Sequence, residues 1–307
     1  MIRVVFFGTP APAVPSLRAF VAAADMDVVA VVTNPDRPSG RGHKLTAPPV
    51  KQAAVELGLD VRQPDRPGDL RDSLEVWDVD ACAVVAYGSI LPQAVLDRGG
   101  AGFVNLHFSL LPAWRGAAPV PASILAGDTV TGVTCFRLDA GMDTGDVLST
   151  HETRIAADET SGELTTRLAE AGAETLVDAV RGLVDGSLEP VPQDHEQATY
   201  ASKIAPEDAR IDWGQAAVQV DRAVRAFNPM PGAHTTVDGR RLKVHRVRPV
   251  FGEATVAPGT VVGEEAGEPV VACGSGLVRL LEVQPAGKPR MTGADFNNGY
   301  RPERLGT

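Results

Sequence analysis

Short apolar runs alternate with helix-like segments along the first two thirds of the chain. The runs are rich in Val, Phe and Ala and occupy 3–7, 26–33, 80–88, 102–108 and 131–138. Segments between them, such as 50–57, carry helix formers and stop at glycine. Fully apolar strands that alternate with helices are typical of a parallel sheet covered on both faces. The pattern therefore predicts an α/β fold with a Rossmann-like, doubly wound, mostly parallel sheet.

The pattern changes after residue 185. Residues 162–185 carry apolar side chains at helical spacing, whereas 186–205 contain glycine and proline with little periodicity. From 206 onward, one helix pattern precedes short strand-like runs separated by glycines, which are typical of a small barrel or sandwich. We predict a first domain over 1–189, a linker over 190–205, and a smaller OB-like β-barrel domain over 206–307.

Composition narrows the class of protein. No apolar run in the 307 residues approaches the ~18 that span a membrane, and the apolar start is too short for a signal peptide. The three cysteines lie far apart, without the spacing of a zinc site or a disulfide framework. We expect a cytoplasmic protein with no membrane partner and no metal.

Charge is divided unevenly along the chain. Residues 1–205 hold 16 Lys and Arg against 27 Asp and Glu, whereas 206–307 hold 13 against 12. A net charge of −10 is not typical of broad, non-specific nucleic-acid binding. Any contact with a nucleic acid must therefore come from local basic patches.

Loops that follow the predicted strands carry most of the candidate chemistry. Ligands of open α/β sheets bind at the carboxyl ends of the strands, so we expect four loops to lie near one another: Gly8–Pro10, Tyr87–Pro92, His107–Pro119 and Asp139–Asp146. The first is not a GxGxxG fingerprint, so a dinucleotide is not indicated, and a plain tight turn is the alternative.

Asn105 and His107 alternate along an extended run, so their side chains should share one face. The loop at 138–146 holds three carboxylates, which either form turns or supply one partner for His107. Such a partner raises the pKa of a histidine and favours the imidazolium. A cationic His and an Asn amide could then stabilise an oxyanion while the carboxylate takes a proton from an amine. Ser109 lacks a surrounding GxSxG, so no covalent nucleophile is indicated.

The run NLHFSLLPAWRGAAP at 105–119, followed by GVTCFRLDAGMDTGDVL at 132–148, closely resembles the tetrahydrofolate-dependent formyltransferases. The resemblance covers essentially the full chain. It implies that Asn105, His107 and Asp143 are catalytic and that 10-formyltetrahydrofolate is the formyl donor. The residues that it implies for folate binding are Tyr87, Ile90, Leu91, Ser109, Leu110, Leu111, Pro112, Asp139, Ala140 and Gly141.

Within this family, the loop NPDRPSGRGHKLTAPP at 34–49 is similar to that of members acting on charged initiator tRNA. The resemblance implies that the α-amine of the methionine on that tRNA is the acceptor. The residues implied for tRNA binding are Arg37, Arg41, Lys44, Arg240, Arg241 and Lys243. A solvated loop and an ordinary exposed strand are the plain alternatives for these two patches.

We expect a monomer. An alternative function is formyl transfer to glycinamide ribonucleotide or an amino sugar, although neither type is expected to carry the 34–49 loop. A non-catalytic nucleic-acid-binding protein is a rival of another class, which the intact Asn/His/Asp set disfavours.

Overall fold

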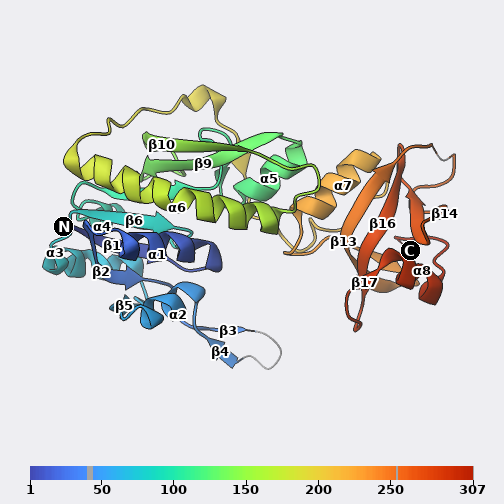
Figure 1. The fold of residues 1–307 in the computed structure, drawn as a ribbon, viewed down its shortest axis with the longest axis horizontal. Coiled ribbons are helices and arrows are strands. Elements are labelled where there is room, and N and C mark those ends of the chain that lie inside the picture. Colours follow the sequence, from blue (N-terminus) through green and yellow to red (C-terminus); the bar gives the residue numbers. More distant parts are fainter. Residues whose placement is uncertain (40–43, 254, 307) are drawn as a thin grey trace. The chain divides into compact units, whose positions relative to one another are not determined.

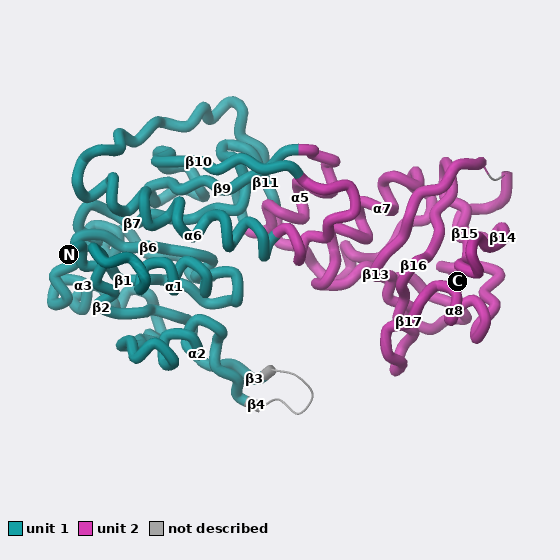
Figure 2. The backbone as a smooth tube through the Cα atoms, viewed as in Figure 1, with its two compact units in different colours: residues 1–116, 130–154, 165–201 teal, residues 117–129, 155–164, 202–307 magenta. Residues whose placement is uncertain are grey.

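The computed structural model describes residues 1–39, 44–253 and 255–306. The chain divides into two compact units, which Figure 2 distinguishes by colour. Unit 1 comprises 1–116, 130–154 and 165–201, and unit 2 comprises 117–129, 155–164 and 202–307. The chain therefore passes between the two units more than once.

Unit 1 is built on a seven-stranded sheet with the order β10-β9-β7-β6-β1-β2-β5 (Figure 1). From β7 to β5 all neighbours are parallel, whereas β9 is antiparallel to β7 and β10 is antiparallel to β9. The predicted mostly parallel α/β sheet is confirmed. The strands are β1 (Ile2–Gly8), β2 (Met26–Val32), β5 (Val61–Arg62), β6 (Ala81–Val85), β7 (Phe103–His107), β9 (Val130–Arg137) and β10 (Val147–Arg154).

Packing on both faces explains why the central strands are largely apolar. Successive residues of a strand point to opposite faces. Phe6 accordingly meets Phe20 of α1 (Val14–Ala22), while Phe7 meets the rings of Tyr87 and Phe103. The long helix α6 (Ser161–Asp185) approaches the sheet at Gly172, where a Cβ would lie 2.9 Å from the Leu106 side chain.

The remaining elements of unit 1 are short. The helical ones are η1 (Ala11–Ala13), α2 (Pro49–Glu56), η2 (Pro67–Leu70), α3 (Arg71–Trp77), α4 (Gln93–Leu96) and η3 (His195–Gln197). Two small ribbons pair β3 (Arg37–Ser39) with β4 (Lys44–Thr46), and β8 (Arg115–Gly116) with β11 (Tyr200–Ala201). None of the helices in the described ranges is long and apolar enough to cross a membrane.

The antiparallel direction of β9 corrects one expectation about the loops. Arg137, at the end of β9, lies opposite Val104 near the start of β7, and Leu138 N–H donates to the Phe103 carbonyl. The Asp139–Asp146 loop thus begins at the amino end of β7, not beside the carboxyl ends of the parallel strands. Hydrophobic periodicity reports that a strand is buried, and it carries no information on strand direction.

The segment predicted as a linker packs on unit 1 as far as Ala201. Val191 exchanges backbone hydrogen bonds with Val147, and β11 adds a parallel pairing with β8. Gln193 in this segment is buried. These residues lack hydrophobic periodicity because they are held by backbone pairing and by one buried polar side chain.

Unit 2 contains a six-stranded antiparallel sheet with the order β12-β13-β16-β15-β14, and β17 pairs with β16. One apolar core, which includes Trp213, Val244, Leu280 and Phe296, joins the sheet to its helices. The C-terminal part of the chain is therefore β-rich, as predicted. The elements of unit 2 are α5 (Pro119–Ala126), α7 (Ala217–Ala226), β12 (His234–Val237), β13 (Arg240–Val250), β14 (Val261–Glu265), β15 (Glu268–Ala272), β16 (Leu277–Pro285), β17 (Met291–Thr292) and α8 (Gly293–Tyr300).

The core of unit 2 gives a stability test. Leu280 is fully buried in this core, so Leu280→Ala should lower the free energy of unfolding by about 2–5 kcal/mol through lost burial and a residual cavity. Val262 of β14 is 41% exposed, so Val262→Ala should cost less than about 1 kcal/mol. Urea titrations followed by far-UV circular dichroism measure both, and equal costs would contradict the assigned core.

Candidate active site

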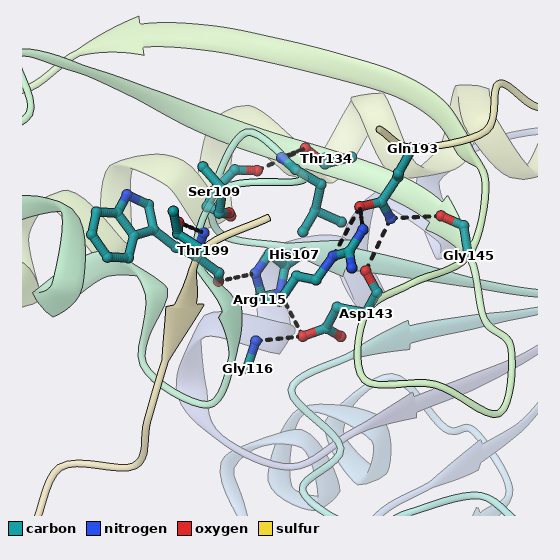
Figure 3. Close-up of polar contacts among 12 residues, drawn as sticks. His107, Ser109, Arg115, Gly116, Thr134, Asp143, Gly145, Gln193 and Thr199 are labelled. Atoms are coloured by element: carbon teal, nitrogen blue, oxygen red, sulfur yellow. Dashed lines mark hydrogen bonds and ion pairs between the residues drawn. The ribbon is translucent and has the colours of Figure 1, made fainter. Parts of the chain in front are cut away.

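His107 lies at the end of β7 (Figure 3), where the residue is buried and only 6% exposed. The ring meets Phe136 of β9 edge-on, and its Nε2 lies 2.9 Å from the carbonyl oxygen of Trp114. Because a carbonyl oxygen can only accept, Nε2 must carry the hydrogen. In the neutral ring, Nδ1 therefore keeps a free lone pair.

Asp143 is the carboxylate that reaches His107. Its Oδ2 accepts a hydrogen bond from Gly116 N–H at 2.7 Å and lies 3.8 Å from His107 Nδ1. The second distance allows ionic attraction but is too long for a hydrogen bond. Asp139 in the same loop instead accepts from Gly141 N–H and the Thr144 hydroxyl, as a turn residue does.

The protonation of His107 differs from the expectation drawn from the sequence. Burial lowers the pKa of His107 below its ordinary value, and the opposing effects of the Asp143 carboxylate and the Trp114 carbonyl do not offset it. At neutral pH the resting imidazole is neutral, with Nδ1 basic and facing Asp143. This group is therefore suited to accept a proton during a reaction.

Asn105 shares the strand β7 with His107, two residues earlier, and is half-buried. Its backbone lies level with Val84 on β6 and Phe136 on β9. The Asn105 side-chain amide makes no hydrogen bond with the part of the chain that the structure describes. Its N–H groups are thus available to an external acceptor near His107.

Two residues expected to bind folate turn their polar groups inward. The Ser109 hydroxyl donates to the Ala113 carbonyl at 2.6 Å, and the Ser109 carbonyl accepts from the Thr134 hydroxyl. Tyr87 is buried against Phe7, and its carbonyl accepts from the Thr9 hydroxyl. Both residues shape loops at the carboxyl ends of β7 and β6.

The other expected folate residues vary in exposure. Ile90 is 92% exposed, Asp139, Ala140 and Gly141 are exposed, Leu91, Leu110 and Pro112 are half-buried, and Leu111 is buried. A cavity of about 380 Å³ is lined by Asp139 with Phe103 and Arg137, at the amino end of β7. Asp139 therefore lines a cavity away from the carboxyl end of that strand.

Several residues expected to bind tRNA are exposed. Arg37 lies on β3 and lines a pocket of about 350 Å³ together with Thr9, Asn34 and Pro48. Arg41 and the side chain of Lys44 lie outside the part of the chain that the structure describes. In unit 2, Arg240 and Arg241 are exposed at the start of β13, and Lys243 is half-buried.

Sequence reasoning missed the residues that support this site from the 190–201 segment. The Thr199 hydroxyl accepts from Trp114 N–H, and the Thr199 carbonyl accepts from Arg115 N–H. Gln193 contacts the loop that carries Asp143. No periodic signal marks these residues, because each acts through a hydrogen bond to a distant part of the chain. Among the described residues, no cluster of His, Cys, Asp and Glu is arranged to hold a metal ion.

Comparisons with known proteins define the class first. Residues 2–180 match the formyl transferase family model, and residues 203–301 match the model of the formyl transferase C-terminal domain. The N-formyltransferase from Helicobacter canadensis, solved with folinic acid and dTDP-3-aminofucose, superposes with a TM-score of 0.69 at 18% identity. The superposition covers 93% of this chain and 100% of the Helicobacter chain. That likeness supports the fold.

The particular branch follows from closer relatives. The methionyl-tRNA formyltransferase of Streptomyces griseus is 46% identical over 302 residues, covering 98% of this chain and 97% of the relative. That of a Nocardioides species is 48% identical over 305 residues, covering 98% and 96%. The structure of the Clostridium thermocellum enzyme of the same name has a TM-score of 0.59 at 15% identity and covers 82% and 96%. The chain belongs to the methionyl-tRNA formyltransferase family of enzymes.

The buried imidazole gives a titration test. We expect His107 to titrate below the ordinary histidine value of 6.5, and lower still in Asp143→Asn, because that change removes the carboxylate that favours the imidazolium. Acid should also destabilise the fold through this residue as pH falls below about 6.5, because the unfolded chain then binds the proton more tightly. Histidine NMR titration, with His107→Gln to assign the resonance, measures this pKa. A His107 pKa of 6.5 or higher would contradict the inference that burial lowers the pKa of this imidazole.

Proposed function

We propose that this enzyme transfers the formyl group of 10-formyltetrahydrofolate to the α-amine of methionine on charged initiator tRNA. The observation that carries the proposal is the contact between the buried, neutral imidazole of His107 and the carboxylate of Asp143, with the amide of Asn105 on the same strand. Formyl transfer to an amine needs a proton acceptor, a stabiliser for its charged form, and a donor for the formyl oxygen. These three side chains supply those groups.

His107 is assigned the proton transfers. The amine loses a proton as its nitrogen bonds to the formyl carbon, and the leaving folate nitrogen gains one as the old C–N bond breaks. Nδ1 of the neutral ring can accept the first proton and deliver it in the second step, so the reaction is balanced without an outside acid. Asp143, whose Oδ2 lies 3.8 Å from Nδ1, stabilises the transient imidazolium.

We assign to Asn105 the stabilisation of the negative charge that develops on the formyl oxygen. A preorganised donor of this kind is worth about 3–4 kcal/mol, or roughly two to three orders of magnitude in rate. Its amide suits this role because no described residue already uses its donors. In this assignment Asn105 acts on the oxygen, whereas His107 acts on the protons.

The folate would supply an activated formyl group, and the loops at Tyr87–Leu91, Ser109–Pro112 and Asp139–Gly141 would hold it. An apolar side chain as exposed as Ile90 suits contact with the flat face of a ring system. The inward hydrogen bonds of Ser109 and the Tyr87 carbonyl support this fit, because they keep the two loops in fixed shapes.

The acceptor tRNA is assigned to the basic residues Arg37, Arg41 and Lys44 of the first unit and to Arg240, Arg241 and Lys243 of the second. Exposed Lys and Arg side chains neutralise phosphates without reading sequence. Local patches of this kind are compatible with the acidic charge of the whole chain. We further propose that the enzyme acts as a monomer in the cytoplasm.

Replacing either His107 or the carboxylate that stabilises its charged form should abolish most turnover. His107→Ala and Asp143→Asn should each lower kcat by roughly two to four orders of magnitude, since the first removes general acid–base catalysis and the second removes its charge stabilisation. The assay follows N-formylmethionine on initiator tRNA. His151 is exposed on β10, so His151→Ala serves as the matched control and should keep wild-type turnover. Near-normal rates in both site variants would refute the assigned roles.

The 34–49 loop should contribute electrostatically to tRNA affinity. Arg41→Ala, or Arg37→Ala, should weaken tRNA binding and reduce the slope of log affinity against log salt by about 1, while kcat at saturating tRNA stays unchanged. Filter binding at several salt concentrations measures the slope. Arg18 is an exposed arginine on α1, and Arg18→Ala is the control. An unchanged slope in both loop variants would count against this role.

A further inference from the structure

The backbone of the Asp143 turn is held by one buried side chain that no catalytic role so far explains. Gln193 is 7% exposed, and its Nε2 donates to the Asp143 carbonyl at 2.9 Å and to the Gly145 carbonyl at 2.7 Å (Figure 3). Both amide hydrogens are thereby used on the two carbonyls that flank Thr144. The carboxamide thus bonds the backbone of this turn and leaves the Asp143 carboxylate to Gly116 N–H and His107.

Arg115 fixes which way the Gln193 amide points. Its Nε and one terminal nitrogen both donate to Gln193 Oε1, at 3.1 and 2.6 Å, and that terminal nitrogen also lies 3.0 Å from His195 Nδ1. A guanidinium has no acceptor, so the oxygen of the amide must face Arg115 and the nitrogen must face the carbonyls. Arg115 is only 2% exposed, which excludes water as an easy substitute partner.

The turn needs such support because of its backbone conformation. Asp143 has φ +54°, a left-handed conformation that costs a non-glycine residue about 1 kcal/mol or more. Gly145 is also constrained, because a Cβ at this position would lie 1.7 Å from the Arg137 carbonyl oxygen. A small relaxation of this turn would move the carboxylate away from Gly116 N–H and from His107 Nδ1.

We propose that Gln193 is a positioning residue for formyl transfer: it clamps the Asp143–Gly145 turn and thereby holds the Asp143 carboxylate beside His107. The proposal rests on the function assigned above. Gln193 touches neither the imidazole nor the reacting atoms, so its effect must pass through Asp143. Displacing a catalytic group by about 1 Å can cost roughly a hundredfold in rate.

Gln193→Glu tests this with little change in size. The new carboxylate can still accept from Arg115, but its second oxygen faces two carbonyl oxygens and cannot donate to them. We expect kcat to fall by about 10- to 100-fold, with KM for charged tRNA changed by less than about threefold. Gln193→Asn keeps the amide but shortens the side chain, so its kcat should lie between those of wild type and Gln193→Glu. This variant replaces Gln193→Glu in the test if the Glu variant does not fold.

The matched control is Gln197→Glu. Gln197 lies in the same segment, is exposed and donates only to Asp194. It undergoes the same change of charge four residues from Gln193, so its kcat should remain within about twofold of wild type. A loss at Gln197 equal to that at Gln193 would overturn the proposal, because the effect would then be general to the segment.

A double-mutant cycle separates positioning from simple structural support. In an Asp143→Asn background, Gln193→Glu should cost less than about threefold, because the group that Gln193 positions no longer works. The same 10- to 100-fold loss in both backgrounds would overturn the positioning role, as would wild-type kcat in the single variants. Single-turnover assays with excess enzyme can measure the slow rates of these variants. Thermal unfolding tests whether each variant is folded.

Assaying the wild-type enzyme alongside the variants separates failure of the positioning role from failure of the proposed function. Absence of N-formylmethionine with wild type would refute formyl transfer to this tRNA. Product from the wild type together with unchanged kcat in the Gln193 variants would refute the positioning role alone.

Discussion

The buried ring of His107 is the group on which the arrangement of the first unit depends. An imidazole out of water needs a partner for its N–H and a neighbour that can stabilise a positive charge if a proton arrives. The Trp114 carbonyl meets the first need, and Trp114 adopts φ +60° where it does so. Asp143 meets the second, also from a left-handed conformation. Two strained residues from separate loops thus converge on one ring.

That convergence explains why so much polar structure surrounds a small site. Strained loop residues persist where the surrounding contacts over-determine them. Here the contacts come from the hydroxyl of Thr199, which accepts from Trp114 N–H, from the side chain of Gln193 and from the buried guanidinium of Arg115. Gln193 and Arg115 each replace water for polar groups that could not be buried alone. The sheet provides the position of β7, and these polar contacts provide the geometry at its end.

Much of the fold could be predicted from local pattern. Apolar runs marked β1, β2, β6, β7 and β9, because strands covered on both faces bury most of their side chains. β10 was missed because it lies at the sheet edge with exposed polar residues, and the direction of β9 because periodicity is the same either way. Alternation also predicted that Asn105 and His107 belong together, whereas their roles in formyl transfer came from resemblance to a family and stay proposals.

The direction of the pKa shift of His107 could not be predicted from the sequence. A neighbouring carboxylate predicts a raised pKa for His107, but the larger effect is burial, which depends on residues from another strand such as Phe136. Gln193 was missed for the same reason. Its neighbours in sequence resemble a linker, and its importance appears only with its partners in place.

The distance along the chain between these partners has a consequence for biosynthesis. Arg115 and Gln193 are 78 residues apart, and Trp114 and Thr199 are 85 apart. A chain emerging from the ribosome can form the seven-stranded sheet of unit 1 before residues 190–201 are made, but β8, the Arg115 side chain and the Asp143 turn then lack their partners. Non-local contacts of this kind form late in folding. The nascent enzyme therefore acquires its sheet first and an ordered Asp143 carboxylate last, when the segment that follows α6 packs on unit 1.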